Sequence, residues 1–215
     1  MSINSKSVKN SLFGSALLNR SSISAKIAYI GVFTAVSVIA NTLLEFRIFD
    51  VQFSLTIFFS ALIGVFLGPV FGFCACFIGD FVGYALNSWG QLYMPWVGIS
   101  TGVIAFQAGV IIGGLKEKSF IETSVRLIVF FCLSFIICTV GINSTGFYLY
   151  NKNIGFSTAV VNYVTNRFGG DVSYFGYVAY RLIFKGQIWN NVANYALLFV
   201  VLPTLREIKP LRVYL

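Results

Sequence analysis

The stretch Ile63–Trp96, IGVFLGPVFGFCACFIGDFVGYALNSWGQLYMPW, decides the fold of this chain. It joins two apolar segments through Gly68-Pro69, places Asp80 inside the second segment, and ends in a loop rich in aromatic and amide side chains. Because proline suits a turn or the first position of a helix, we expect one helix to end before Pro69 and another to begin there. A single acid in an apolar run with small residues at four-residue spacing is typical of a packed membrane helix.

The composition of the whole chain agrees with a membrane protein. Of its 215 residues, 57% are hydrophobic and 10% are charged, which leaves too little polar surface to cover a soluble globule. There is no histidine, the four cysteines lie in apolar runs without CxxC spacing, and no phosphate-binding loop or nucleophile elbow occurs. We therefore expect no metal site and no catalytic residue, although a small membrane transferase stays an alternative.

Six candidate spans can be read from the sequence, each near the length needed to cross a bilayer. They are Ile27 to Leu44, Leu55 to Leu67, Val70 to Leu86, Val97 to Leu115, Val125 to Ile142 and Leu182 to Leu205. The expected fold class is an all-α integral membrane protein with a six-transmembrane-helix bundle in residues 27–205. Residues 1–26 are expected to be a basic amphipathic helix on the membrane or a disordered tail, and residues 206–215 a basic tail.

The distribution of basic residues predicts the orientation of these spans. Residues 1–26, the connection 116–126 and the carboxyl-terminal tail fall on one side of a six-span chain and carry ten of the 15 basic residues. Because basic segments stay in the cytoplasm, we expect both termini there, in a multi-pass protein of a bacterial cell membrane. The basic residues form no single patch, so a nucleic-acid partner is not expected.

Three segments are expected on the outer side: residues 45–53, residues 87–96 and residues 143–180. The last is long and rich in tyrosine, which predicts either a lid over a ligand or a belt of tyrosines at the headgroup level. Ring and amide side chains suit a large, flat, partly polar ligand. The candidate ligand-binding residues are Arg47, Asn87, Trp89, Gln91, Tyr93, Trp96, Tyr148, Tyr163, Arg167, Tyr174, Tyr177 and Arg181.

Asp80 lies deep in its expected span and requires a partner, because an isolated buried carboxylate is costly. The best candidates are Arg181 or Lys185 at the outer start of the last span. We expect a buried ion pair between Asp80 and Arg181, and a direct role in ligand binding or in coupling is the alternative.

Small residues also form a stripe on the first span, where Ala28, Gly31 and Ala35 recur at helical spacing. Small residues allow helices to approach closely within a membrane. The stripe is therefore expected either to pack within the bundle or to dock another membrane subunit.

Three motifs carry a resemblance to a known family: LIGVFLGPVFGFCACFIGDFVGYAL (residues 62–86), LYMPWVGIS (92–100) and the layout of RLIFKGQIWNNVANYALLFVVLPTL (181–205). In these the chain resembles the membrane-embedded substrate-binding subunit, or S component, of an energy-coupling factor (ECF) vitamin transporter, in its folate-type branch. The resemblance covers residues 27–205. It implies six helices, a vitamin held by the outer loops, and a transport subunit that is not itself an enzyme.

The resemblance also implies partners: a transmembrane coupling subunit (T component) and two cytoplasmic ATPases, toward which the S component topples to deliver its vitamin. In the family an Ala-x-x-x-Ala stripe on the first helix meets the coupling subunit, whereas this chain has Gly31-x-x-x-Ala35. For the ligand we favour cobalamin, because the outer residues are mostly Asn, Gln, Tyr and Trp. Folate, whose anionic tail favours several cations, is the alternative.

Overall fold

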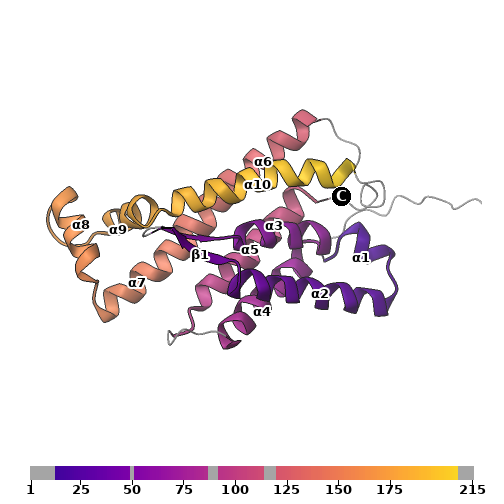
Figure 1. The fold of residues 1–215 in the computed structure, drawn as a ribbon, viewed down its shortest axis with the longest axis horizontal. Helices are drawn as coiled ribbons and strands as arrows, with labels where there is room; N and C mark the ends of the chain where they lie inside the picture. Colours follow the sequence, from indigo (N-terminus) through magenta and orange to yellow (C-terminus); the bar gives the residue numbers. More distant parts are fainter. Residues whose placement is uncertain (1–12, 49–50, 87–91, 114–119, 208–215) are drawn as a thin grey trace, which may run out of the picture.

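The computed structural model describes residues 13–48, 51–86, 92–113 and 120–207. Figure 1 shows a bundle of α2 to α5, with α6 and α10 lying beside it and α7 to α9 extending beyond one end. The elements are α1 (Ala16–Arg20), α2 (Ile23–Thr42), β1 (Glu45–Ile48), β2 (Val51–Ser54), α3 (Thr56–Leu67), α4 (Pro69–Leu86), α5 (Pro95–Ile111), α6 (Phe120–Ser134), π-helix η1 (Phe135–Ser144), α7 (Thr145–Ile154), α8 (Thr158–Phe168), α9 (Tyr174–Ala179), π-helix η2 (Tyr180–Phe184) and α10 (Gln187–Glu207).

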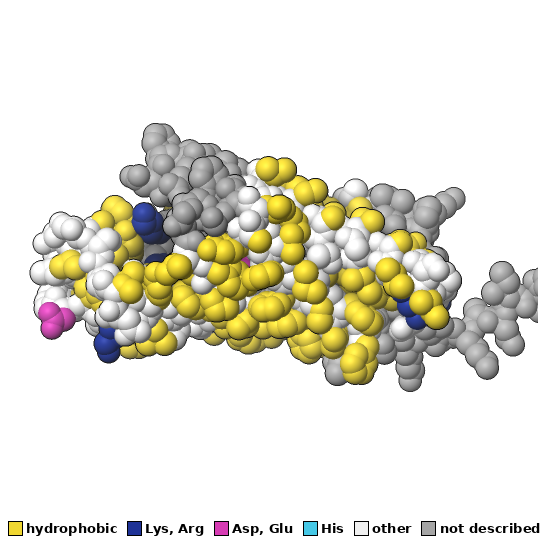
Figure 2. Space-filling view, turned by 90° about the horizontal axis from the view of Figure 1, so that it is seen from below, with side chains coloured by type: hydrophobic (Ala, Val, Ile, Leu, Met, Phe, Trp, Pro, Cys, Tyr) yellow, Lys and Arg dark blue, Asp and Glu magenta, His cyan; other side chains and the backbone are white. Residues whose placement is uncertain are grey.

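The helices have the length and composition of membrane spans. By these criteria four described segments could cross a membrane: α2, α4, the continuous helix Ile121–Ile154, and Gln187–Leu205. Two shorter apolar helices, α3 and α5, coincide with the second and fourth expected spans. Figure 2 shows a face that is hydrophobic over most of its length, with the described charged side chains mostly near its two ends. The expected all-helical membrane fold is confirmed.

The turn at Gly68-Pro69 forms as the sequence predicts. Gly68 ends α3 with a positive φ of 91°, a conformation that favours glycine, and Pro69 is the first residue of α4. Around this turn the helices pack backbone against backbone: a Cβ on Gly64 would overlap the carbonyl of Ala105 in α5, and one on Gly109 would lie 2.6 Å from the nitrogen of Pro69. Small residues therefore determine how closely α3, α4 and α5 approach.

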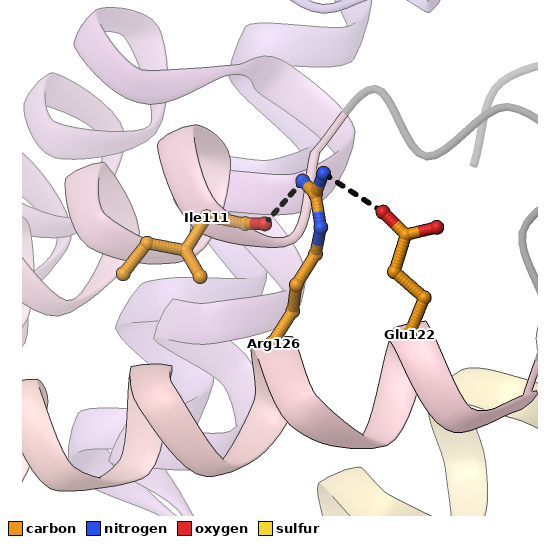
Figure 3. A network of polar contacts seen from close by, with 3 residues as sticks. All are labelled: Ile111, Glu122 and Arg126. Atoms are coloured by element: carbon orange, nitrogen blue, oxygen red, sulfur yellow. Dashed lines mark hydrogen bonds and ion pairs between the residues drawn. The ribbon is translucent and has the colours of Figure 1, made fainter.

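We call the end of the bundle at Gly68-Pro69 the turn end. Residues of the amino-terminal segment pack here, where the backbone nitrogen of Ser15 donates to the carbonyl of Leu67 and Leu18 is only 1% exposed. Arg126 of α6 donates to the carbonyl of Ile111 at the end of α5 and pairs with Glu122 at 3.2 Å (Figure 3). The open carbonyls that end α3 and α5 thus receive donors from other segments.

The opposite end, which we call the hairpin end, contains the strands β1 and β2. They pair antiparallel, with Ile48 opposite Val51, where an irregular loop was expected. The strands are held by α10: Asn190 accepts from the backbone nitrogen of Ser54, and Asn194 accepts from that of Phe58 and donates to the carbonyl of Ser54. The alternation of polar and apolar residues in EFRI and VQFS explains the strands.

The expected outer loop 143–180 is wrong, because most of this segment is helical. The fifth span continues without interruption to Ile154, and Gly155, with a φ of 101°, ends it. We call residues 145–179, which comprise α7, α8 and α9, the cap. The cap has its own apolar core of Val160, Val164 and Tyr177, which packs with Tyr180 of η2. The tyrosines make this segment amphipathic, so it folds as helices.

Candidate functional site

Unsatisfied buried polar atoms gather at the hairpin end. Within the described residues, five buried side-chain atoms have no hydrogen-bond partner, and four of them are near this end: Tyr93 Oη, Trp96 Nε1, Asn143 Oδ1 and Gln187 Oε1. The fifth, Gln107 Oε1, is further along α5. Because buried polar atoms are nearly always hydrogen-bonded, such a group of unsatisfied atoms indicates a place that another molecule completes.

Arg181 is the central charge of this region. It is 8% exposed, its Nη1 donates to the carbonyl of Asn143 at 2.9 Å, and its guanidinium carbon lies 4.1 Å from the ring centroid of Phe147. It forms no ion pair with an acid whose side chain the structure describes. Burial lowers the pKa of Arg181 to about 10, with Tyr177 acting in the opposite direction, so the side chain stays cationic at neutral pH.

Trp96 and Asn143 complete the surroundings of Arg181. The Trp96 ring packs on Gly146, where a Cβ would overlap it, and meets Phe147 edge to face at 5.7 Å. Asn143 donates from Nδ2 to Ser100 Oγ at 3.0 Å, which leaves its buried Oδ1 open. The Trp96 indole N–H and the Arg181 guanidinium are hydrogen-bond donors, and the Asn143 amide oxygen is an acceptor. Together they can bind a ligand edge that carries both acceptors and donors.

Asp80 is on the other side of α5. A Cβ on Gly98 would lie 2.9 Å from Asp80 Oδ2 and 3.0 Å from Tyr93 Oη, so both atoms adjoin this glycine. Gly98 and Ser100 differ by about 200° around a helix, which separates Asp80 from the group at Arg181. The expected ion pair between Asp80 and Arg181 is therefore wrong, because α5 lies between them. Lys185 forms no ion pair with Asp80 in the described part either.

Tyr93 lies in the segment that leads into α5, outside the helix itself. Burial and then the Asp80 carboxylate raise the pKa of Tyr93 to about 12, so its hydroxyl stays protonated at neutral pH. The hydroxyl is beside Asp80 but has no partner of standard hydrogen-bond geometry among the described residues. A protonated phenol next to a carboxylate presents a donor and an acceptor together.

Most of the tyrosines that we expected to bind a ligand pack against other aromatic rings, and their role in binding stays a prediction. Tyr148 contacts Tyr174 at 5.5 Å and Tyr177 at 5.8 Å, and Tyr163 contacts Tyr180 at 5.5 Å. The Tyr174 hydroxyl donates to the carbonyl of Val140 in η1. In this structure these side chains hold the cap together and attach it to the long helix.

The remaining candidates are distributed as follows. Arg167 lies over the Tyr163 ring at 5.4 Å on the exposed side of the cap. Asn87, Trp89 and Gln91 fall outside the described residues, as does the side chain of Arg47. Asn143, Phe147 and Ser100 were missed. An asparagine and a phenylalanine one helical turn apart could have been found had the fifth helix been extended past residue 142.

The small-residue stripe of α2 lies on an exposed surface. Ala28, Gly31 and Ala35 are all exposed, and a Cβ on Gly31 would meet no atom within 4 Å. Glycines inside the bundle differ, since a Cβ on Gly79 would lie 2.5 Å from Ser37 Cβ. The stripe therefore does not pack within the described chain. In the same residues, no group of His, Cys, Asp and Glu is placed to hold a metal ion.

The comparisons with known proteins bear directly on this arrangement. A family model described as "ECF-type riboflavin transporter, S component" matches residues 22–183. The chain belongs to this family. As an S component it is a membrane-embedded transport subunit and not an enzyme, which confirms both expectations.

A solved structure supports the same fold for the S component. The crystal structure of FolT bound with folic acid is similar with a TM-score of 0.53 and 18% sequence identity, over 84% of this chain and 90% of that chain. No curated protein matches the chain. Neither the matching family nor the FolT structure is described as binding cobalamin, so our preference for that vitamin stays a prediction without support from the comparisons.

Proposed function

We propose that this S component captures a vitamin of the folate class at the hairpin end and holds the anionic end of the vitamin at Arg181. One observation carries the proposal: Arg181 is a buried cation that forms no ion pair with any described acid. A buried charge is costly unless it is paired. A carboxylate of the ligand would supply the missing partner.

The donors around Arg181 support a carboxylate in this position. A guanidinium has five N–H groups, and one of them reaches the carbonyl of Asn143. Two of the remaining N–H groups can donate to the two oxygens of one carboxylate. Such a bidentate pair is the strongest form of this interaction. The indole N–H of Trp96, which is buried and has no hydrogen-bond partner among the described residues, is a further donor within the same group.

Riboflavin and cobalamin are the competing ligands. The family description favours riboflavin, but riboflavin is uncharged and brings no anion to Arg181. Cobalamin was favoured because the outer residues are mostly Asn, Gln, Tyr and Trp, and several of these tyrosines lie in the aromatic core of the cap. FolT, which resembles the chain in fold, binds folic acid. Folate is the vitamin among these that carries free carboxylates.

For delivery we propose that the exposed stripe of Ala28, Gly31 and Ala35 docks a transmembrane coupling subunit. Membership of the family implies such a subunit and its ATPases in general. Small residues allow two membrane helices to approach closely. A Cβ on Gly31 would meet no atom of the described chain within 4 Å, unlike a Cβ on Gly64 or Gly109, so a helix of another subunit could pack here. In this proposal the hairpin end is the outer face, and toppling toward the partners carries the vitamin inward.

A titration of the purified full chain in lipid nanodiscs tests the proposed ligand. Folic acid, riboflavin and cyanocobalamin are added separately, and binding is measured by isothermal calorimetry. We expect saturable binding of folic acid at submillimolar concentration and at least tenfold weaker binding of the other two. Saturable binding of riboflavin or cyanocobalamin with no binding of folic acid would overturn the proposal.

A further inference from the structure

We propose that Asp80, together with Tyr93, recognises the 2-amino-4-oxopyrimidine edge of a pterin ring and so determines which vitamins this S component accepts. This inference rests on the proposed folate-class ligand and concerns the opposite end of that ligand from the carboxylates. It assigns a specificity role to two residues on the side of α5 that faces away from Arg181.

Asp80 is a buried acceptor whose carboxylate interacts with the Tyr93 hydroxyl. Its side chain is 8% exposed, in the middle of α4, and it forms no ion pair with a described cation. An ionisable side chain at membrane depth is expensive, and it is usually present because it binds something. The residue cannot be explained as half of a structural ion pair, because Arg181 is on the far side of α5.

Tyr93 is the second polar group at the same place. Its hydroxyl is buried, lacks a partner of standard hydrogen-bond geometry among the described residues, and adjoins Gly98 together with Asp80 Oδ2. Glycine at position 98 leaves room for both groups, because a Cβ would lie 2.9 Å from the carboxylate oxygen and 3.0 Å from the Tyr93 hydroxyl. A carboxylate and a protonated phenol are thus held side by side, one of them able to accept and the other to donate.

Aromatic rings surround this polar pair. Phe81 meets the Tyr93 ring edge to face at 5.3 Å, and Tyr84 lies 5.1 Å from the same ring. Phe77 is next to Gly98 and stacks on Phe73 at 6.1 Å. Rings of this kind suit a flat heteroaromatic ligand, whose orientation is then fixed by a few polar groups.

The order of donors and acceptors on the ligand edge decides which ring fits. A pterin presents the 2-amino N–H and the N3–H side by side, followed by the 4-oxo group. The two N–H groups match the two oxygens of a carboxylate, and the 4-oxo group can accept from the Tyr93 hydroxyl. A flavin presents carbonyl, N–H and carbonyl, so one carbonyl would face the carboxylate and be repelled. Asp80 therefore favours a pterin over a flavin.

The first test compares two ligands on the unmodified protein. Folic acid and its analogue with the 2-amino group replaced by oxygen differ only at this edge, and each is titrated into the full chain in nanodiscs. We expect the analogue to bind roughly 10- to 100-fold more weakly, because one charge-assisted hydrogen bond is exchanged for a repulsion. Equal affinities for the two compounds would overturn the inference and leave the proposed function standing.

The second test changes the protein. In Asp80→Asn the side-chain amide can donate to the 2-oxo group, so we expect the preference for folic acid over the analogue to fall at least tenfold or to reverse. Asp171→Asn, at an exposed acid outside the site, is the matched control and should keep the wild-type preference. An unchanged preference in Asp80→Asn would contradict the inference.

If Asp80→Asn does not fold, Tyr93→Phe provides the second variant. The comparison of the two ligands on the wild-type protein still tests the inference without any mutation. Tyr93→Phe should weaken both ligands by a similar factor, since both carry the 4-oxo group. Failure of folic acid itself to bind would refute the proposed function and this inference together. The two failures are thus distinguishable.

Discussion

Two arginines, one at each end of the molecule, show how differently the ends are built. At the turn end Arg126 is partly exposed, donates to the carbonyl of Ile111 and pairs with Glu122 (Figure 3). At the hairpin end Arg181 is buried, donates to the carbonyl of Asn143 and lies over Phe147 without an acid among the described residues. The first arginine has an acidic partner, whereas the second has none among the described residues.

The helices around the two arginines differ in the same way. Near the turn, glycines bring the backbones of α3, α4 and α5 into direct contact, as at Gly64 and Gly109. Near the hairpin, the helices are separated by large side chains, and several buried donors and acceptors have no partner among the described residues. A membrane bundle that is closely packed at one end and has unsatisfied polar atoms among its described residues at the other is suited to bind a molecule at the second end.

The largest expected effect comes from filling the tight packing at the turn end. In Gly64→Val the new side chain would overlap the Ala105 carbonyl, which is backbone and cannot move aside. We expect a loss of stability well above about 3 kcal/mol and little folded protein by size-exclusion chromatography. Gly31→Val is the control: its site is open, so stability should change by under about 0.5 kcal/mol. Normal folding of Gly64→Val would contradict the packing described.

The next effect separates the two arginines. Arg181→Gln removes the cation proposed to pair with the ligand and should cost about 2–4 kcal/mol of binding, a roughly 30- to 1,000-fold loss of folate affinity. Arg126→Gln should lower the free energy of unfolding by under about 1 kcal/mol and leave the affinity unchanged. Calorimetric titration of both variants measures the difference. Equal affinities for the two variants would show that Arg181 is a structural residue like Arg126.

A smaller effect is expected where α10 holds the hairpin. Asn194 is buried and bonds the backbone nitrogen of Phe58 and the carbonyl of Ser54. Asn194→Leu leaves both groups unsatisfied and should cost about 2 kcal/mol, seen as a lower melting temperature and faster hydrogen exchange in β1 and β2. The exposed Asn162→Leu should change neither quantity. Unchanged exchange in the hairpin of Asn194→Leu would mean that another contact holds it.

The fold could be predicted where a residue type strongly favours one local structure. Gly68-Pro69 predicted a helix end and a helix start, and the structure has both. The boundary at residue 142 was wrong because the polar residues that follow it were taken for a loop, although the chain has no strong breaker before Gly155. The hairpin was missed since two short alternating runs, 45–48 and 51–54, lie between apolar helices that dominate the pattern.

The candidate site was predictable in place but not in its contacts. Tyr93, Trp96 and Arg181 all lie at the hairpin end, and their role in binding stays a prediction. The sequence could not show that Tyr148, Tyr174 and Tyr177 meet one another, because this depends on how α7 and α9 pack. Nor could it show that Asp80 and Arg181, at similar depth, are separated by α5. The depth of a side chain in the membrane follows from its position along the helix. The direction in which the side chain points depends on how the helix is rotated about its own axis.

The most direct test of the central claim is an experimental structure of the full chain with folic acid bound. We expect a carboxylate of the ligand within ion-pair distance of the Arg181 guanidinium, with the indole N–H of Trp96 as a further donor. Folic acid bound elsewhere, or at the hairpin end with its carboxylates directed away from Arg181, would contradict it.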